Sequence, residues 1–316
     1  IAPFPYSAGC SCRCLEYKRS PKNNSMNNSP SSRFSHALGP PRVTFLRCSG
    51  LVTLGMLIAS WISVLGADRV SRQPFLSVET LNRIIIFLKD LLGLGRPGTP
   101  AYLQIEAWIE TASLAYDTLV ISVLGIAVAG SVALATFMFG ARNLMVGELA
   151  GYRSTSSRGL FLIIRAFFVG TRAIPELIWA MLIIFVFLPG IVPAALALGI
   201  HNAGILGKLA AEVVEGLDSR PMRSLRVNGA TRLQMMMYGV LPEALPRFIT
   251  YLFYRWEVII RTTIVVGFVA AGGLGLEFRL SMSYFHYTQV TLLLIWYLIL
   301  VVAVDLTAAV LRRLVQ

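Results

Sequence analysis

Charged residues are scarce in this sequence. They make up 14% of the 316 residues, whereas an ordinary soluble domain has about a quarter. Acidic residues are the scarcest, with 16 Asp and Glu against 28 Lys and Arg. Apolar residues account for 56% of the chain, more than a soluble protein of this size readily buries. The composition excludes a typical water-soluble enzyme and favours lipid as the solvent.

Histidine and cysteine are also few, which bears on metal binding. The cysteines are Cys10, Cys12, Cys14 and Cys48. Zinc ligands are usually spaced C-x₂₋₄-C with further Cys or His ligands, but the first three cysteines form C-x-C-x-C with only His36 nearby. We expect neither a metal site nor a disulfide framework, and no cofactor on this chain. A nucleophile–base set, which a membrane enzyme would need, is not evident either.

The apolar residues are grouped in long blocks instead of narrow stripes. A helix needs about 20 apolar residues to cross a bilayer, so these blocks predict an all-α bundle of about six transmembrane spans. After the first block, apolar residues in 78–94 recur at i, i+3, i+4 and i+7, which predicts an amphipathic helix on the membrane surface. The predicted spans are 51–66, 115–139, 174–188, 192–208, 248–271 and 290–311, with a membrane-entering helix before Pro175.

The charges between the blocks predict the topology. The N-terminal segment, the loops after the second and fourth blocks and the C-terminus are rich in Arg, whereas 67–113 holds as many Asp and Glu as Lys and Arg. Basic loops stay inside, so both termini should be cytoplasmic and the neutral loop external. The positive balance thus indicates a membrane rather than a nucleic acid. We predict that 1–46 is disordered, that the native chain starts at Met26 and that no cleavable signal peptide is present.

Residues 208–246 are too polar to span lipid, yet they carry the signals of two short helices. Asp218 or Ser219 can cap the first helix, and Gly229 can end it in the left-handed conformation. Thr231 can cap a second helix that ends near Gly239, and two prolines further on would start the entry into the fifth span. The pattern predicts a compact knob rather than a simple loop.

The spacing from Gly229 to Leu241-Pro242 resembles the EAA loop of bacterial binding-protein-dependent ABC importers. Over about residues 109–313 the sequence resembles one subfamily, the phosphonate and phosphite permeases. The stretches that carry this resemblance are RAIPELIWA (172–180), ALALGIHNAGILGKLAAEVVEGLDS (195–219), NGATRLQMMMYGVLPEALPRFITYLFYRWEVIIR (228–261) and VVGFVAAGGLG (265–275). The chain departs from the wider motif at 223–225, which read Arg-Ser-Leu instead of Glu-Ala-Ala, and at Gly239, where Ile is usual.

The resemblance implies a type I ABC importer permease domain over 111–316, preceded by a first transmembrane helix and an external loop over 47–110. The implied partners are two copies of a cytoplasmic ATP-binding subunit, a second permease copy in a homodimer, an extracytoplasmic solute-binding protein and the bacterial inner membrane. The implied cargo is a phosphonate, phosphite or a related phosphorus oxyanion. The implied ATPase-coupling loop comprises Arg220, Arg223, Arg226, Asn228, Gly229, Ala230, Thr231, Arg232, Gly239, Leu241 and Pro242.

ATP would be bound by the partner subunit. The glycine-rich stretch at 272–275 follows no predicted strand and is not followed by G-K-[ST], so it lacks the features of a nucleotide-binding loop. The permease itself is therefore expected not to be an enzyme.

Three charged residues fall inside the fifth span, namely Arg255, Glu257 and Arg261. Charges at that depth usually face a cavity or a partner. The spacing of Glu257 and Arg261 favours an i, i+4 ion pair with a structural role, and the alternative is that both residues belong to the translocation path or gate. For Arg255 two interpretations are open, a structural contact or a cation that lowers the barrier for an anionic substrate.

Arginines 158, 165 and 172 are seven apart and share one helix face, where we expect them to extend to the lipid headgroups. Arg172, Pro175 and Glu176 match the subfamily and are candidate gate residues. For His201 we expect hydrogen-bonded packing in the fourth span, and for Asp305 an Arg partner that the sequence does not identify.

Two rival functions are open at this stage. An ion-coupled secondary transporter would need paired intramembrane carboxylates or inverted repeats, and neither is evident in the sequence. An ABC permease for a different small solute, such as phosphate, would share every feature above.

Overall fold

The computed structural model describes residues 45–66, 77–95, 98–147 and 155–315, and the regular structure in these ranges is helical. The predicted disorder of 1–46, the native start at Met26 and the cysteine cluster lie almost wholly outside the described residues. The chain divides into two compact units, 1–74 and 75–316. The first contains helix α1 (Phe45–Gly66), which overlaps the first predicted span.

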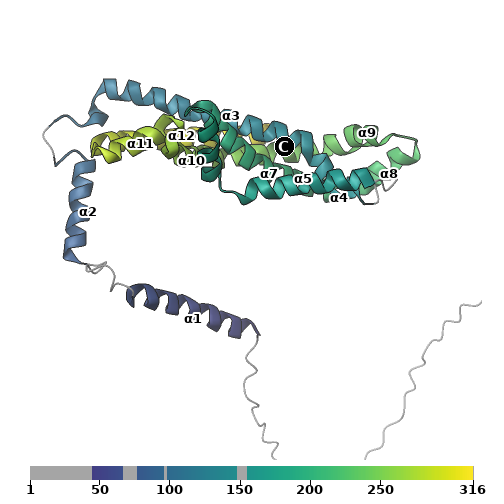
Figure 1. Cartoon of the computed structure of the whole chain (residues 1–316), viewed down its shortest axis with the longest axis horizontal. Coiled ribbons are helices and arrows are strands. Elements are labelled where there is room, and N and C mark those ends of the chain that lie inside the picture. The colour runs from purple at the N-terminus through teal and green to yellow at the C-terminus, as the bar shows by residue number, and fades with distance from the viewer. Residues whose placement is uncertain (1–44, 67–76, 96–97, 148–154, 316) are drawn as a thin grey trace, which may run out of the picture. The chain divides into compact units, whose positions relative to one another are not determined.

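The second unit contains the helices of the candidate site (Figure 1). They are α2 (Val78–Leu91), η2 (Ala101–Leu103), α3 (Ile105–Gly140), α4 (Arg142–Met145), α5 (Thr155–Ala173), α6 (Glu176–Val186), α7 (Ile191–Glu215), α8 (Ser219–Val227), α9 (Arg232–Gln234), η4 (Met235–Val240), α10 (Leu241–Val266), η5 (Gly267–Ala271), α11 (Gly273–Ser283) and α12 (Tyr287–Val315). Helix α2 confirms the predicted helix over 78–94. Its N-cap is Ser77, whose hydroxyl accepts a hydrogen bond from the Thr80 N–H.

Three helices of the described chain, α3, α7 and α12, are long and apolar enough to cross a membrane unaided. Two bent helix pairs also meet this criterion when each pair is taken as one span. These pairs are α5 with α6, and the continuous helix that includes α10 with α11, so the described chain has up to five candidate spans. Helix α1 contributes a shorter apolar segment. The predicted third span is wrong as a separate crossing, since α6 has only 11 residues and turns 95° from α5.

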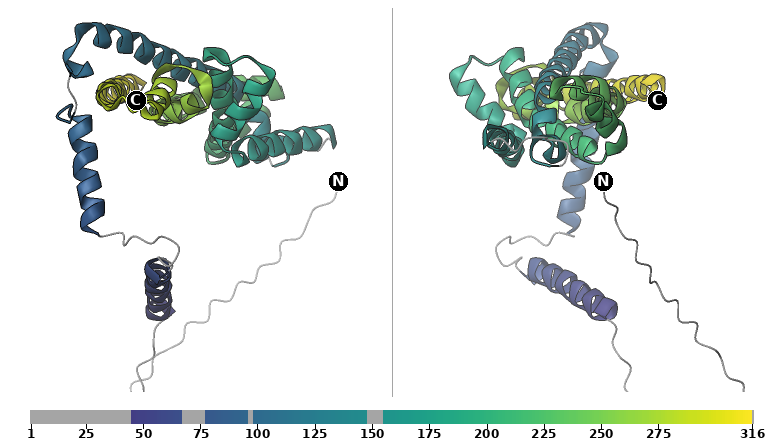
Figure 2. Two further views of the ribbon diagram at one scale, coloured as in Figure 1. Left: turned by 60° about the vertical axis from the view of Figure 1, so that its left-hand side comes forward. Right: turned by 90° about the vertical axis from the view of Figure 1, so that its right-hand side faces the viewer.

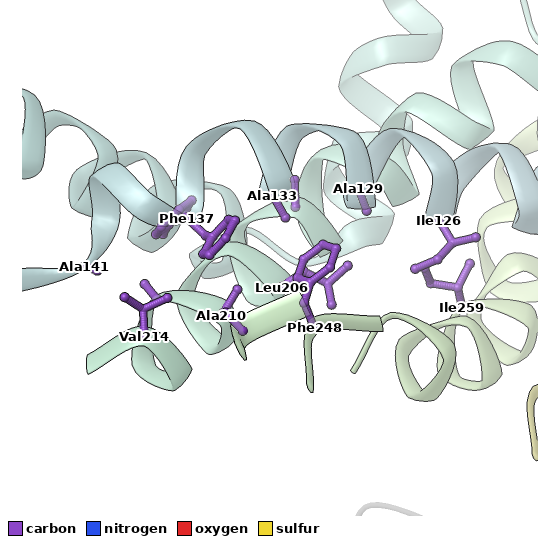
Figure 3. Packing of buried hydrophobic residues seen from close by; sticks show 14 of the residues in the cluster. Ile126, Ala129, Ala133, Phe137, Ala141, Leu206, Ala210, Val214, Phe248 and Ile259 are labelled. Carbon is purple, nitrogen blue, oxygen red and sulfur yellow. The ribbon is translucent and has the colours of Figure 1, made fainter. Parts of the chain in front are cut away.

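Small residues hold the bundle together at the contact of α3 with α7. Ala129 and Ala133 on α3 are fully buried and face α7 and α10 (Figure 3). A Cβ on Gly125 would lie 3.2 Å from the Leu198 Cβ, and one on Gly199 would lie 2.7 Å from a Val128 methyl carbon. Close approach at small residues is how helices associate in lipid, where apolar burial gives little drive.

The surface of this unit is apolar and its interior contains polar groups. Phe185, Val186 and Leu188, at and just after the end of α6, are 86%, 79% and 89% exposed. Conversely, Ser122 and Asn202 are fully buried. Water would penalise such a surface, whereas lipid accommodates it.

Helices α8 and α9 lie at one end of the second unit, and α11 lies toward the other end (Figure 1). Two further views show the same bundle with α3, α7 and α10 packed alongside one another (Figure 2). At one level of the bundle, Trp256 on α10 donates a hydrogen bond to the Ser122 hydroxyl on α3 at 3.3 Å. Further toward α8, Phe137 and Phe248 stack with their centroids 6.0 Å apart.

Candidate functional site

Helix α8 is capped as its sequence predicts. Asp218 is the N-cap, and its carboxylate accepts a hydrogen bond from the Arg220 N–H at 3.0 Å. At the other end Gly229 has φ of 85°. Its N–H donates to the Arg226 carbonyl at 3.0 Å, and the Ala230 N–H donates to the Leu225 carbonyl at 3.1 Å. This pair of bonds is a Schellman motif, so its backbone conformation favours glycine here.

Gly229 also presents open space. No heavy atom lies within 4 Å of the position that a Cβ would take. The sequence predicted a left-handed glycine at this position. Within this chain its conformation explains it, and the space beside it is available to a partner.

The second helix of the knob does not end near Gly239, and that prediction is wrong. Thr231 caps α9 with a capping box that includes Gln234. The chain then runs without interruption through the π-helical turn η4 into α10. Pro242 directly follows the π-helical turn, in the first turn of α10, and Pro246 lies inside the helix. The knob is therefore α8 alone, attached to the extended end of a membrane helix.

Gly239 lets α8 lie against η4. A Cβ at this position would be 3.1 Å from the Leu225 Cδ1 and 3.5 Å from the Met222 Cγ. Met222 is 1% exposed and is the buried residue of α8. Two of the departures from the family motif, Leu at 225 and Gly at 239, thus lie next to each other.

The basic residues assigned to the coupling loop divide into two groups. Arg220, Arg223 and Arg226 are exposed on α8. Arg232 instead turns toward the bundle and donates to the Leu144 carbonyl at 2.6 Å, and also to the Met145 Sδ and the Ser157 hydroxyl. Arg232 therefore fixes the start of α9 against α4 and α5, a contact that the linear sequence does not reveal.

A second set of bonds clamps the helix ends next to α8. Glu215, the last residue of α7, accepts the Arg142 N–H at 2.7 Å and pairs with the Arg165 guanidinium. Arg165 also donates to the Gly140 carbonyl at 2.8 Å, and Asn143 donates to the Val214 carbonyl at 2.9 Å. Arg165 thus joins α5 to α3 and α7, instead of extending to lipid headgroups as predicted.

A polar cluster lies in the bundle interior at the break between α5 and α6. The Asn202 Oδ1 on α7 accepts the Nε of Arg255 at 3.1 Å and its Nη2 as well. The neighbouring His201 has its Nδ1 2.9 Å from the Ile174 carbonyl oxygen and its Nε2 3.3 Å from the Glu176 carboxylate. Two of the candidate path residues, Glu176 and Arg255, therefore belong to one region, and His201 is hydrogen-bonded as expected.

The other charges of the fifth span pair across helices, not within α10. Glu257 binds Arg312, and Arg261 binds Asp305 at 2.7 Å. The predicted Glu257–Arg261 pair is wrong, because both side chains turn toward α12. Glu257 and Arg261 are still structural contacts, because their pairs with Arg312 and Asp305 join α10 to α12. The Arg partner of Asp305 is Arg261. Among the remaining gate candidates, Arg172 is half-buried near the end of α5 and Pro175 is the exposed N-cap of α6.

Comparison with known proteins identifies the family. The family model described as binding-protein-dependent transport system inner membrane component matches residues 143–316, more than half of the chain. The chain belongs to this family. It is the permease component of an ABC importer and a multi-pass inner-membrane protein. Importers of this kind work with an ATPase and a binding protein.

The relatives of this permease agree on the family. It is 32% identical over 238 residues to the phosphite transport system permease protein PtxC of Stutzerimonas stutzeri, covering 75% of this chain and 81% of that protein. It is 37% identical over 118 residues to the putative cryptic phosphonate transport system permease protein PhnE2 of Escherichia coli strain K12, covering 37% of this chain and 97% of that protein. The resemblance drawn from the motif stretches is thereby confirmed.

The fold of this permease also has solved counterparts. An inward-facing structure of the MetNI methionine ABC transporter aligns with a TM-score of 0.56 at 20% identity, covering 65% of this chain and 96% of that one. An amino acid ABC transporter aligns with a TM-score of 0.51 at 15% identity, covering 66% and 98%. The expected type I importer permease fold is thereby confirmed.

Proposed function

We propose that this permease imports phosphite, a phosphonate or a related phosphorus oxyanion. The observation that carries the proposal is the likeness to permeases named for phosphite transport, at 32% identity over 238 residues and 38% over 141. The structure supports it, because Arg255 and His201 place cationic or polarisable groups in a predominantly apolar bundle. An anion crossing such a bundle needs fields of this sign.

Phosphate is the second candidate cargo. A relative named as the phosphate-import permease protein PhnE of Mycolicibacterium smegmatis is 28% identical over 200 residues. Phosphate and phosphite share charge and shape to a first approximation, so the permease has few features by which to distinguish them. The solute-binding protein would make the selection.

Uptake into proteoliposomes tests the cargo and the energy source together. The permease, its ATPase and its binding protein are reconstituted, and the uptake of labelled phosphite, methylphosphonate and phosphate is compared. We expect vanadate to abolish uptake and a proton uncoupler to leave it unchanged. The reverse sensitivity would favour the ion-coupled secondary transporter, and the absence of uptake of all three oxyanions would refute the cargo.

We further propose that α8 is the surface that binds the ATPase, and that ATP is bound and hydrolysed by that separate subunit. The exposed Arg220, Arg223 and Arg226 suit an acidic recess, and the open space at Gly229 allows a partner to approach. Because α8 is held to η4 by Met222 and Leu225, a movement of α8 would be transmitted to α10 as a rigid body. The hydrogen bonds of Arg232 would transmit the same movement to α4 and α5.

Two kinds of substitution test the coupling surface separately, namely charge reversal and the introduction of a large side chain. We expect Arg220→Glu with Arg223→Glu to abolish co-purification of the ATPase, while Arg247→Glu on the exposed side of α10 does not. Gly229→Trp should also abolish it, whereas Gly229→Asn, which tolerates the left-handed conformation, should retain part of it. Unchanged co-purification of both the double variant and Gly229→Trp would rule out α8 as the ATPase contact.

The assembly completes the proposal. Two permease copies in a homodimer, two ATPase copies and one extracytoplasmic binding protein would form the importer, with 111–316 as the permease domain and both termini in the cytoplasm. The orientation follows from the Arg-rich segments, including the α8 region. Cysteine labelling at Ser224 from the cytoplasmic side only, in sealed vesicles of known orientation, is the expected result. Native mass spectrometry of the complex gives the copy numbers.

A further inference from the structure

The break between α5 and α6 creates a helix N-terminus beside His201. Helix α6 restarts at Glu176 after a 95° bend, and Pro175 is its N-cap without a side-chain cap bond. The first N–H groups of a helix have no partner within it, and the dipole gives this end a partial positive charge. In transporters, interrupted helices of this kind present their N-terminal ends to anionic groups.

Arg255 differs from other arginines of the bundle in what holds it. Arg165, Arg261 and Arg312 are each paired with a carboxylate, namely Glu215, Asp305 and Glu257. Arg255 is held by the neutral amide of Asn202. A carboxylate in direct contact would cancel the charge of the guanidinium, whereas an amide positions it and leaves its charge available.

Asn202 is itself fixed. It is fully buried, and its Nδ2 donates to the Leu198 carbonyl at 2.8 Å, so its Oδ1 must face Arg255. Both bonds use the Nε and Nη2 edge of the guanidinium. Within the described residues Nη1 makes no hydrogen bond, so one arm of Arg255 is held in place and unsatisfied. Arg255 is half-buried and its Nη1 is not enclosed by the bundle, so a ligand can reach this charged N–H group.

The anionic group in this region is the carboxylate of Glu176. This carboxylate lies 3.3 Å from the Nε2 of His201, the residue next to the Asn202 that holds Arg255. A carboxylate resembles a phosphorus oxyanion in charge and in its acceptor oxygens. Because Glu176 is half-buried at the first position of α6, it can turn away without disrupting the bundle core.

We propose that Arg255, His201 and the N-terminal turn of α6 form an oxyanion site at the break between α5 and α6, in which Glu176 acts as a resident counter-anion that the cargo displaces. Asn202 is the positioning residue that holds Arg255 for this contact. The inference rests on the proposed cargo, and it adds the residues that contact the cargo in transit. Glu176 keeps the empty site neutral, and its return would help release the bound oxyanion.

The decisive experiment places a carboxylate at position 202, next to Arg255. Asn202→Asp places a fixed anion next to Arg255, so phosphite uptake should fall by roughly tenfold or more, because the carboxylate cancels the charge that the oxyanion would meet. Combining Asn202→Asp with Glu176→Gln restores the net charge but leaves the anion where it cannot turn away. We expect the double variant to remain inactive. Recovery of uptake in it would show that only charge balance matters and would overturn the displacement mechanism.

Glu176→Gln alone gives an independent readout, because it keeps a hydrogen-bonding side chain beside His201. Without the resident anion the cargo should bind more tightly and leave more slowly, so both KM and the maximal uptake rate of phosphite should fall by a factor of about three to ten. The complete importer with its binding protein is used throughout, and uptake is divided by ATP hydrolysed. Unchanged KM and rate would overturn the proposal.

Two controls separate the possible failures. Arg261→Gln removes a cation that is paired with Asp305, so it should lower the amount of stable protein but leave the KM for phosphite unchanged. If wild-type importer takes up no phosphorus oxyanion, the cargo proposal fails. If wild type takes up phosphite and neither Asn202→Asp nor Glu176→Gln alters uptake, the cargo proposal stands and the site is refuted.

Discussion

The contact between Leu225 and Gly239 predicts a specific coupling between two substitutions. The wider family motif has Ala and Ile at these positions, so this chain has exchanged a small and a large residue across one contact. Gly239→Ile and Leu225→Ala would each restore one half of that arrangement. The two residues lie next to each other, and substitutions at neighbouring positions are not expected to be additive.

The magnitudes follow from the geometry. A Cβ at 239 would lie 3.1 Å from the Leu225 Cδ1, the mobile end of a side chain, so Gly239→Ala should be tolerated and gain about 0.5 kcal/mol in helix propensity. The larger Ile would press on Leu225 and the buried Met222, at a cost of about 1–3 kcal/mol. Leu225→Ala should cost about 1–2 kcal/mol, below the range for fully buried Leu because this residue is half-buried.

In the double variant the Ile side chain occupies the space that Leu225 leaves. We expect its stability to lie within about 1 kcal/mol of wild type, so the coupling energy should be about 1–3 kcal/mol. The measurement is amide hydrogen exchange over α8 for the permease in nanodiscs without its ATPase, because exchange reports the local opening free energy of this helix. Additive effects of the two substitutions would refute the contact.

Three further predictions concern the bundle. Asp305→Asn should destabilise the protein in detergent by about 1–3 kcal/mol because Arg261 loses its partner, and adding Arg261→Gln should recover part of the loss; a larger loss in the double variant would contradict the pairing. Gly204→Ala should lower the midpoint of thermal unfolding, since its Cβ would lie 2.0 Å from the Thr171 hydroxyl oxygen and 2.9 Å from a backbone carbonyl, and an unchanged midpoint would contradict this packing. Arg232→Gln should leave ATPase co-purification intact but lower uptake per ATP hydrolysed, and equal losses of both would contradict a transmission role.

Much of the fold could be predicted because its signals are local. Apolar blocks, caps and breakers act within a few residues of one another, so α3, α7, α10 and α12 overlap four predicted spans. The caps at Asp218 and Thr231 and the left-handed Gly229 were also evident from neighbouring residues. Prediction failed locally at Pro242, because a π-helical turn adjusts the hydrogen bonding ahead of it and lets a helix continue where proline usually begins one.

The candidate site was harder to predict because its contacts join distant segments. Asn202 and Arg255 are separated by 53 residues, and Glu257 and Arg312 by 55. Which side chain meets which depends on the rotation and offset of packed helices. Spacing along one helix suggested Glu257 with Arg261, but both residues face α12, so the nearest opposite charge in the sequence was not the partner.

The sequence by itself determined that this chain crosses a membrane, where most of its long apolar helices lie, and that it resembles an importer permease. These properties depend on composition, local propensity and motifs. The tertiary structure alone decided that α6 turns 95° away from α5, that Arg232 binds the bundle while its neighbours on α8 are exposed, and that an amide holds Arg255. Each of these depends on side chains brought together from separate helices, where packing in three dimensions, rather than order along the chain, selects the partner.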